Sequence, residues 1–159
     1  MPQNEVLHRL AWEDRWTQPD LADLIAPLQE QSKGPFEALM GQIETLLPVR
    51  RDVKWCGPAW KWTIRYTSLD SQEEELDLLA YLVPNSVAPL VCIPMANNII
   101  ERLPMRRLNR FIRNGIGSAK CAVATHWAEW NLTADGEANH LMDIIKRKHK
   151  ILLDPVAKS

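Results

Sequence analysis

Aromatic and basic residues are interleaved between Lys54 and Tyr66, and this stretch holds the residues best suited to binding chemistry. In a strand over residues 59–66, alternate side chains would share a face. One face would carry Trp60, Trp62, Ile64 and Tyr66, and the other would carry Lys61, Thr63 and Arg65. Indole rings fill protein cores and also line ligand pockets, so the aromatic face has two interpretations, core or pocket.

A second aromatic pair, Trp127 and Trp130, follows Lys120 in the sequence. If these two indoles face the strand at 59–66, they close an aromatic pocket. The basic rim of that pocket would come from Lys61, Arg65 and Lys120. Such a pocket suits an anionic or aromatic small molecule, because apolar walls bury the ligand and a few polar groups orient it. The alternative is a single aromatic core cluster.

Arginines recur between Pro104 and Asn114. In a helix over these residues, Arg106, Arg110 and Arg113 form one stripe. Close guanidinium groups repel one another unless an acid or a bound anion lies among them, so the stripe, with Arg107 beside it, is a candidate contact for an anion or a nucleic acid. The alternative is a solvated helix face. Gly115 is expected to end the helix, because glycine favours the position after a helix C-cap. The Gly-x-Gly loop that Gly115 opens is not expected to bind phosphate, since it follows a helix and phosphate loops follow a strand.

No motif identifies an enzyme. The cysteines form no CxxC pair, and His140 and His149 are too far apart to chelate one metal ion from a single helical turn. Carboxylates between Asp70 and Asp77 are a candidate site for a hard cation, although their spacing matches no calcium loop. We therefore assign no catalytic residue, no metal ligand and no cofactor from spacing. The alternative that the protein is an enzyme, with catalytic residues that meet only in the folded chain, stays open.

Short apolar runs bounded by turn residues predict strands over 59–66, 76–83 and 90–93, followed by one bent strand or two between 120 and 132. Pro94 is expected to end the third strand. Helical periodicity predicts helices near 4–16, 20–28, 35–47, 99–103, 104–114 and 135–152. The predicted class is α+β, a small antiparallel sheet packed against helices as a two-layer sandwich with extra N-terminal helices. The expected core comprises Leu39, Met40, Ile43, Leu47, Leu79, Tyr81, Val91, Ile93, Ile145 and Leu152.

The composition is that of an ordinary globular domain. A chain of 159 residues is long enough for one domain with a full core. Its formal net charge of −1 predicts no general attraction to nucleic acid or to anionic membranes. Sparse cysteines, an N-terminus without a signal-peptide pattern and no long apolar run lead us to expect a cytoplasmic protein. Oligomeric state is not specified by these features.

Aromatic and turn residues at several positions resemble those of the YdhG-like domains of unknown function. The resemblance is carried by residues 55–60, 79–82, 89–94 and 120–132 and by the basic end of the last helix at 146–148. It implies a frataxin-like two-layer α+β domain over residues 34–153, preceded by a helical extension over residues 1–33. Some relatives in that family are discussed as iron chaperones. The first helix here mixes Glu5, Glu13 and Asp14 with basic residues and lacks the acidic ridge that this role needs.

The sequence therefore predicts a binding module with an aromatic pocket and a basic rim. An intracellular iron or metal chaperone is the alternative from another class, and an enzyme with a site hidden in the sequence is a third.

Overall fold

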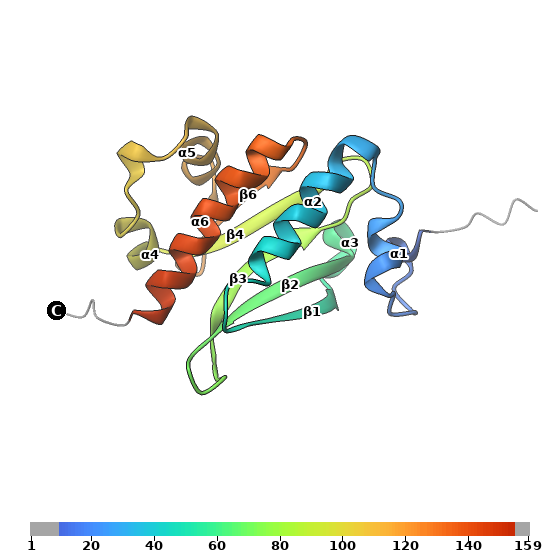
Figure 1. Cartoon of the computed structure of the whole chain (residues 1–159), viewed down its shortest axis with the longest axis horizontal. Coiled ribbons are helices and arrows are strands. Elements are labelled where there is room, and N and C mark those ends of the chain that lie inside the picture. The colour runs from blue at the N-terminus through green and yellow to red at the C-terminus, as the bar shows by residue number, and fades with distance from the viewer. Residues whose placement is uncertain (1–9, 155–159) are drawn as a thin grey trace, which may run out of the picture.

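The computed structural model describes residues 10–154, except for the side chain of Asp135. A six-stranded antiparallel sheet runs in the order β1-β2-β3-β4-β6-β5. The strands are β1 (Val49–Trp55), β2 (Trp62–Leu69), β3 (Glu75–Val83), β4 (Leu90–Ala96), β5 (Lys120–Ala122) and β6 (Thr125–Asn131). Two long helices, α2 (Glu30–Ile43) and α6 (Asp135–Leu153), lie side by side on one face of the sheet (Figure 1). The predicted α+β class, a sheet packed against helices, is confirmed.

The apolar face of α2 is largely as expected. Phe36, Leu39, Met40 and Ile43 are buried in the core. The helix begins at Glu30 and ends at Ile43, so its predicted extension to Leu47 is wrong, and the Leu47 side chain is 77% exposed. A domain boundary between residues 33 and 34 would fall inside α2.

The chain before α2 packs on the start of β2. It forms η1 (Ala11–Glu13) and α1 (Leu21–Ile25), whereas residues 1–9 of the expected first helix lie outside the described residues. The indole N–H of Trp12 donates to the Trp60 carbonyl at 2.8 Å, and that of Trp62 donates to the Asp14 carbonyl at 2.6 Å. These two bonds fix the turn that leads into β2.

Two strand predictions are wrong for identifiable reasons. The edge strand β1 was missed because most of its residues are charged and Arg51 interrupts the apolar face formed by Val49, Val53 and Trp55. Strand β4 continues through Pro94 to Ala96. The Pro94 carbonyl faces the gap beyond the last β3–β4 residue pair, so the missing N–H interrupts no ladder bond there.

The expected helix over 104–114 is two elements. After α4 (Asn97–Glu101) come η2 (Met105–Arg107) and α5 (Arg110–Gly117). The Asn109 side chain accepts from the Phe111 backbone N–H at 2.8 Å and so caps α5. Gly115 lies inside α5, which continues to Gly117, so the prediction that Gly115 ends the helix is wrong.

The final helix α6 buries Leu141, Ile144 and Ile145, whereas Leu152 is only half-buried. Ala134, whose side chain cannot accept a hydrogen bond, stands at its N-cap position. The carboxylate of Glu137, at N3, supplies the reciprocal half of a capping box, because it accepts from the backbone N–H groups of Thr133 and Ala134 at 2.8 and 3.0 Å. Within residues 10–154, no helix has the length and apolar character needed to cross a membrane.

The turn between β5 and β6 is strained. Val123 and Ala124 have φ angles of 52° and 58°, the left-handed region that favours Asn and Gly in two-residue hairpins. Replacing them together by Asn and Gly should raise the free energy of unfolding by about 1 kcal/mol or more, because the native turn then costs less. Urea unfolding checks the value. Unchanged or lower stability would mean that the turn is not under strain.

Candidate functional site

The sheet has one face covered by helices and one free of the long helices. Tyr66 points to the covered face, where its hydroxyl donates to Glu44 Oε2 near the end of α2 at 2.8 Å. Side chains of directly paired residues share a face, so the strand register assigns the other face as well. Along one row it carries Asp52, Arg65, Tyr81, Cys92 and Glu129.

Trp60 and Trp62 lie on opposite sides of the sheet, so the expected shared aromatic face is wrong. Trp60 belongs to the one-turn helix α3 (Gly57–Trp60), and Lys61 follows it with a φ of 57°, which breaks the strand alternation. Trp62 then starts β2 on the covered face, where it is 9% exposed and meets Trp55 edge-on at 5.8 Å between ring centroids.

Trp130 is also a core residue. It is 4% exposed, and its indole N–H donates to the Phe111 carbonyl of α5 at 3.0 Å. Trp62 and Trp130 are therefore core residues, and neither lies on the free face.

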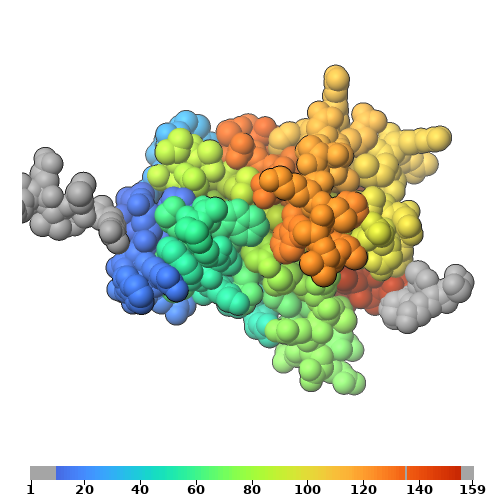
Figure 2. Space-filling model, turned by 180° about the vertical axis from the view of Figure 1, so that it is seen from behind, coloured from blue at the N-terminus to red at the C-terminus, as the bar shows by residue number. Residues whose placement is uncertain are grey.

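Three rings form an aromatic row on the free face. Trp60 and Tyr81 have their ring centroids 5.2 Å apart, and Tyr81 and Trp127 have theirs 6.2 Å apart. Tyr81 is buried beneath its neighbours, whereas Trp60 and Trp127 are half-buried. Figure 2 views the molecule from behind, where the blue-green segment with α3 and the orange β5–β6 hairpin stand on either side of a strip of the central sheet. Trp127 thus presents an indole supported from below by Tyr81.

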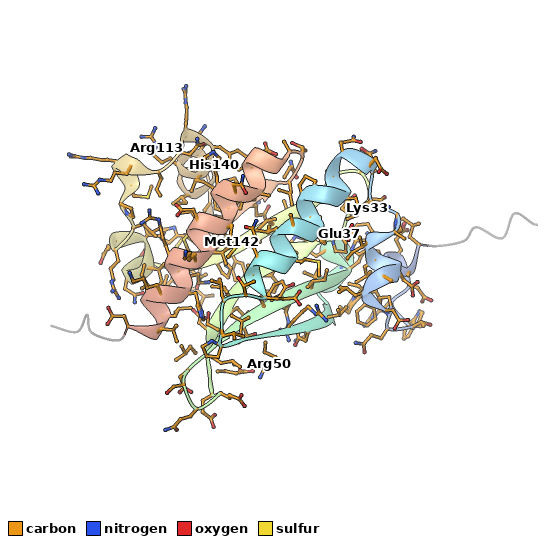
Figure 3. The ribbon with its side chains drawn as sticks, viewed as in Figure 1. Lys33, Glu37, Arg50, Arg113, His140 and Met142 are labelled. Carbon is orange, nitrogen blue, oxygen red and sulfur yellow. The ribbon has the colours of Figure 1, made fainter. Side chains whose placement is uncertain are left out.

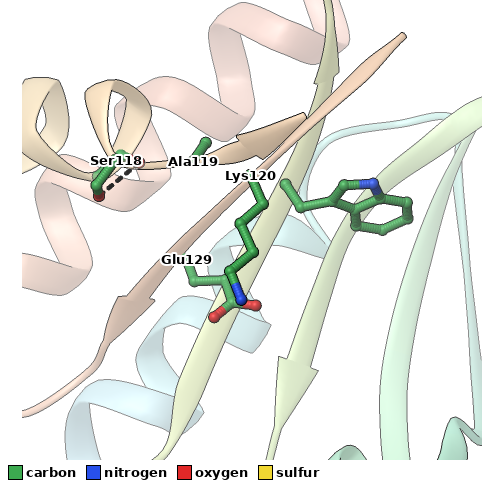
Figure 4. A pocket seen from close by; sticks show the side chains of 6 residues that line it. Ser118, Ala119, Lys120 and Glu129 are labelled. Carbon is green, nitrogen blue, oxygen red and sulfur yellow. Dashed lines mark hydrogen bonds between the residues drawn. The ribbon is translucent and has the colours of Figure 1, made fainter. Parts of the chain in front are cut away.

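A cavity of about 230 Å³ lies where this row meets the α5–β5 edge (Figure 4). It is lined by Gly115, Ser118, Ala119, Lys120, Trp127 and Glu129. Lys120 and Trp127 are direct partners in the β5–β6 register, so the hairpin places the ammonium group and the indole on the same wall. Two residues that sequence reasoning singled out are therefore brought together here.

Ser118 and Glu129 were missed as candidates. Glu129 lies two residues after Trp127 in β6, so strand alternation alone puts both on one face. Ser118 follows α5, and its hydroxyl donates to the Asn114 carbonyl at 2.9 Å. Its lone pairs remain able to accept a bond from a ligand.

Arg65 lies outside this cavity and is committed to a partner. Its Nε and Nη2 donate to the two carboxylate oxygens of Asp52 at 2.9 and 2.6 Å. The bond from Arg65 lowers the pKa of Asp52, so the pair is fully ionised at neutral pH. Arg65 lines a separate hollow of about 400 Å³ near the β2–β3 hairpin, where Arg50 in turn pairs with Glu75.

The other predicted residues are dispersed. Lys61 sits 4.7 Å above the Trp12 ring and donates to the Pro58 carbonyl at 3.0 Å. Arg106 is on η2, whereas Arg110 and Arg113 are on α5, so the expected single stripe is broken at Asn109. None of these four lines the cavity beside Trp127.

The acidic hairpin is held by its own bonds. Asp70 Oδ1 accepts from the backbone N–H groups of Gln72 and Glu74 at 2.8 and 3.0 Å, and Glu75 pairs with Arg50. Across residues 10–154, His, Cys, Asp and Glu side chains form no group of three or more that could hold a metal ion.

Cys92 on β4 and Cys56, which lies between β1 and α3, are neutral thiols at neutral pH. Burial raises the pKa of Cys92 to about 12, with the nearby Glu129 acting in the same direction. Burial also raises the pKa of Cys56. A thiolate is the nucleophilic form of cysteine, so neither residue is activated for covalent chemistry at neutral pH.

A buried lysine was not anticipated from the sequence. Lys148 of α6 is fully buried, and its ammonium donates to the carbonyls of Leu78 and Pro94, in the gap between β3 and β4. Next to it, His149 Nδ1 lies 2.8 Å from the Ser68 hydroxyl. The sequence pattern places both among the basic residues that end the last helix. Helical periodicity gives a signal for this inward orientation, because Lys148 follows Ile144 and Ile145 by four and three residues and so lies on the apolar face of the helix.

Comparison of the chain with models of protein families, with curated proteins and with solved structures finds no match. The resemblance to YdhG-like domains stays a prediction, and the candidate site rests on its geometry alone.

Proposed function

We propose that this protein is a binding module whose ligand is a small aromatic anion held in the cavity beside Trp127. The observation that carries the proposal is the pairing of Trp127 with Lys120 on one wall of that cavity. An indole face binds a planar ring by stacking, and an exposed ammonium attracts the anionic group.

The volume of the cavity and the other residues that line it limit the size and the functional groups of the ligand. Small-molecule sites commonly occupy about 300–1,000 Å³, so a cavity of about 230 Å³ suits a ligand of one or two rings. Glu129 adds a carboxylate close to Lys120 (Figure 4). A ligand that offers an N–H donor to Glu129 as well as an anion to Lys120 therefore matches both charged groups.

The bonds within the acidic hairpin make the metal-chaperone alternative less favoured. Two of the hairpin carboxylates that would hold a cation are already bonded, Asp70 to the backbone of its own turn and Glu75 to Arg50. A cation would have to displace these partners, which lowers the net gain from binding.

Indole-3-acetate combines a planar ring, an N–H donor and a carboxylate, and it is a suitable probe. We expect calorimetric titration to detect its binding, with the affinity lowered at least tenfold, about 1.4 kcal/mol, by Trp127→Ala and by Lys120→Gln. Indole without the carboxylate should bind more weakly to the wild type and should be insensitive to Lys120→Gln.

Matched controls use residues outside the cavity. Trp16 is 83% exposed and Lys54 is exposed on β1, so Trp16→Ala and Lys54→Gln should leave the affinity unchanged. Absence of heat with indole-3-acetate, or equal losses in the control variants, would contradict the proposal. Urea unfolding of each variant separates loss of binding from loss of fold.

A further inference from the structure

Positive charge is concentrated in one continuous segment of a chain that is almost neutral overall. Residues 102–128 contain five arginines and one lysine, and no aspartate or glutamate. Removing these six cations from the formal net charge of −1 leaves −7 for the rest of the chain. The expectation of no attraction to nucleic acid rests on the net charge alone, which averages out this separation.

Four of these arginines form an exposed group that we call the arginine corner, made of Arg106 and Arg107 on η2 and of Arg110 and Arg113 on α5. The apolar side chains between them, Leu108 and Ile112, are buried in the core, so the cations face solvent. Figure 3 shows Arg113 at the α5 end of the molecule.

The arginine corner differs from most arginines elsewhere in the described chain by its lack of carboxylate partners; Arg15, which stacks on Trp16, is the exception. Arg50, Arg51, Arg65 and Arg147 pair with Glu75, Glu44, Asp52 and Asp143. Across residues 10–154, Arg106, Arg107, Arg110 and Arg113 form no ion pair and donate no side-chain hydrogen bond. Neighbouring guanidinium groups without a counter-charge repel one another, so an added anion stabilises this surface.

We propose that the arginine corner binds the phosphate backbone of a nucleic acid. A guanidinium group donates two parallel hydrogen bonds to a phosphate, and four that are exposed within eight residues of sequence, on two consecutive elements, can contact several phosphates of one chain. The negative remainder of the protein repels a polyanion, so the molecule approaches it with this corner first. An anionic membrane is a poorer match, because the apolar side chains of η2 and α5 point inward and leave no anchor for the lipid.

This surface is separate from the cavity beside Trp127, so the two proposals can fail independently. The test measures fluorescence anisotropy of a labelled 20-nucleotide oligothymidine and of a 20-base-pair duplex at 50 mM and 200 mM KCl. We expect binding at 50 mM KCl with a logarithmic salt slope of about −3 to −4, because each of four phosphate contacts contributes about −0.7 to −0.9. The triple variant R106Q/R110Q/R113Q should lower the affinity at least tenfold.

The matched control removes the same charge from other exposed sites. Lys54, Lys146 and Lys150 are exposed, and K54Q/K146Q/K150Q should change the affinity less than about threefold. Equal losses in the two triple variants would overturn the proposal, since only overall charge would matter. Absence of binding at 50 mM KCl would overturn it too, as would tight binding to vesicles with 30% phosphatidylserine and none to nucleic acid. Circular dichroism confirms that each variant is folded.

Discussion

Replacing Gly115 by alanine should destabilise the protein by about 3 kcal/mol, although alanine is the better helix former. A Cβ atom at position 115 would lie 2.1 Å from Nε1 and 2.2 Å from Cε2 of Trp130. The indole cannot move away cheaply, because it is buried and its N–H is bonded to the Phe111 carbonyl of the same helix. Either that bond breaks or α5 shifts away from β6.

Gly117 provides the matched control, because it lies in the same helix and a Cβ atom added there would meet nothing within 4 Å. Gly117→Ala should leave the stability unchanged or raise it by up to about 1 kcal/mol. Urea unfolding of both variants therefore should give changes of opposite sign or clearly different size. Equal stabilities would show that α5 does not press on Trp130.

Wild-type stability, measured relative to Lys148→Met, should rise by about 2–3 kcal/mol between pH 7 and pH 10. Burial lowers the pKa of Lys148 to about 8 from its ordinary value near 10.5, against the opposing influence of Asp77 and Cys92. Below pH 8 the ammonium is charged in both states, and the folded state carries the full cost of burying it. Between these two pKa values the unfolded chain holds more protons than the folded chain, so the free energy of unfolding rises with pH. Each unit of pKa difference corresponds to about 1.4 kcal/mol.

The measurement is urea unfolding at pH values from 6 to 10 for wild type and Lys148→Met. Lys150→Met is the control, because Lys150 is an exposed residue of the same helix. Its stability difference from wild type should not change with pH over this range. A Lys148→Met curve that runs parallel to the wild-type curve would show that the lysine is not buried as a charged group.

Regular apolar spacing was enough to predict the core of α2 and the strands β3 and β4. At Leu79, Tyr81, Val91 and Ile93, burial in the structure agrees with that spacing. The pattern failed where charge or a single backbone angle decides the structure. β1 mixes charged residues with a few apolar ones and is identified by its pairing to β2, and the positive φ of Lys61 sends Trp60 and Trp62 to opposite faces.

The candidate site was predictable only in part. Lys120 and Trp127 come together because a hairpin register pairs them, and the sequence had left open whether one or two strands were present there. The contribution of Ser118 and Gly115 depends on how α5 packs against β6, which no local pattern encodes. Two of the candidate tryptophans, Trp62 and Trp130, are buried, and their indole N–H groups donate to backbone carbonyls far away in sequence or on another element.

The charged edge strand β1 affects whether copies of the protein aggregate in solution. Its outer side leaves backbone N–H and C=O groups open to pairing with another strand, which is how sheets recruit neighbours into aggregates. Arg50, Arg51, Asp52 and Lys54 flank that edge on both faces, and Arg50, Arg51 and Asp52 are tied to partners in their own chain. An incoming strand would have to bury or displace these charges. These charges thereby oppose growth of the sheet at its β1 edge, while the face without the long helices stays available for recognition.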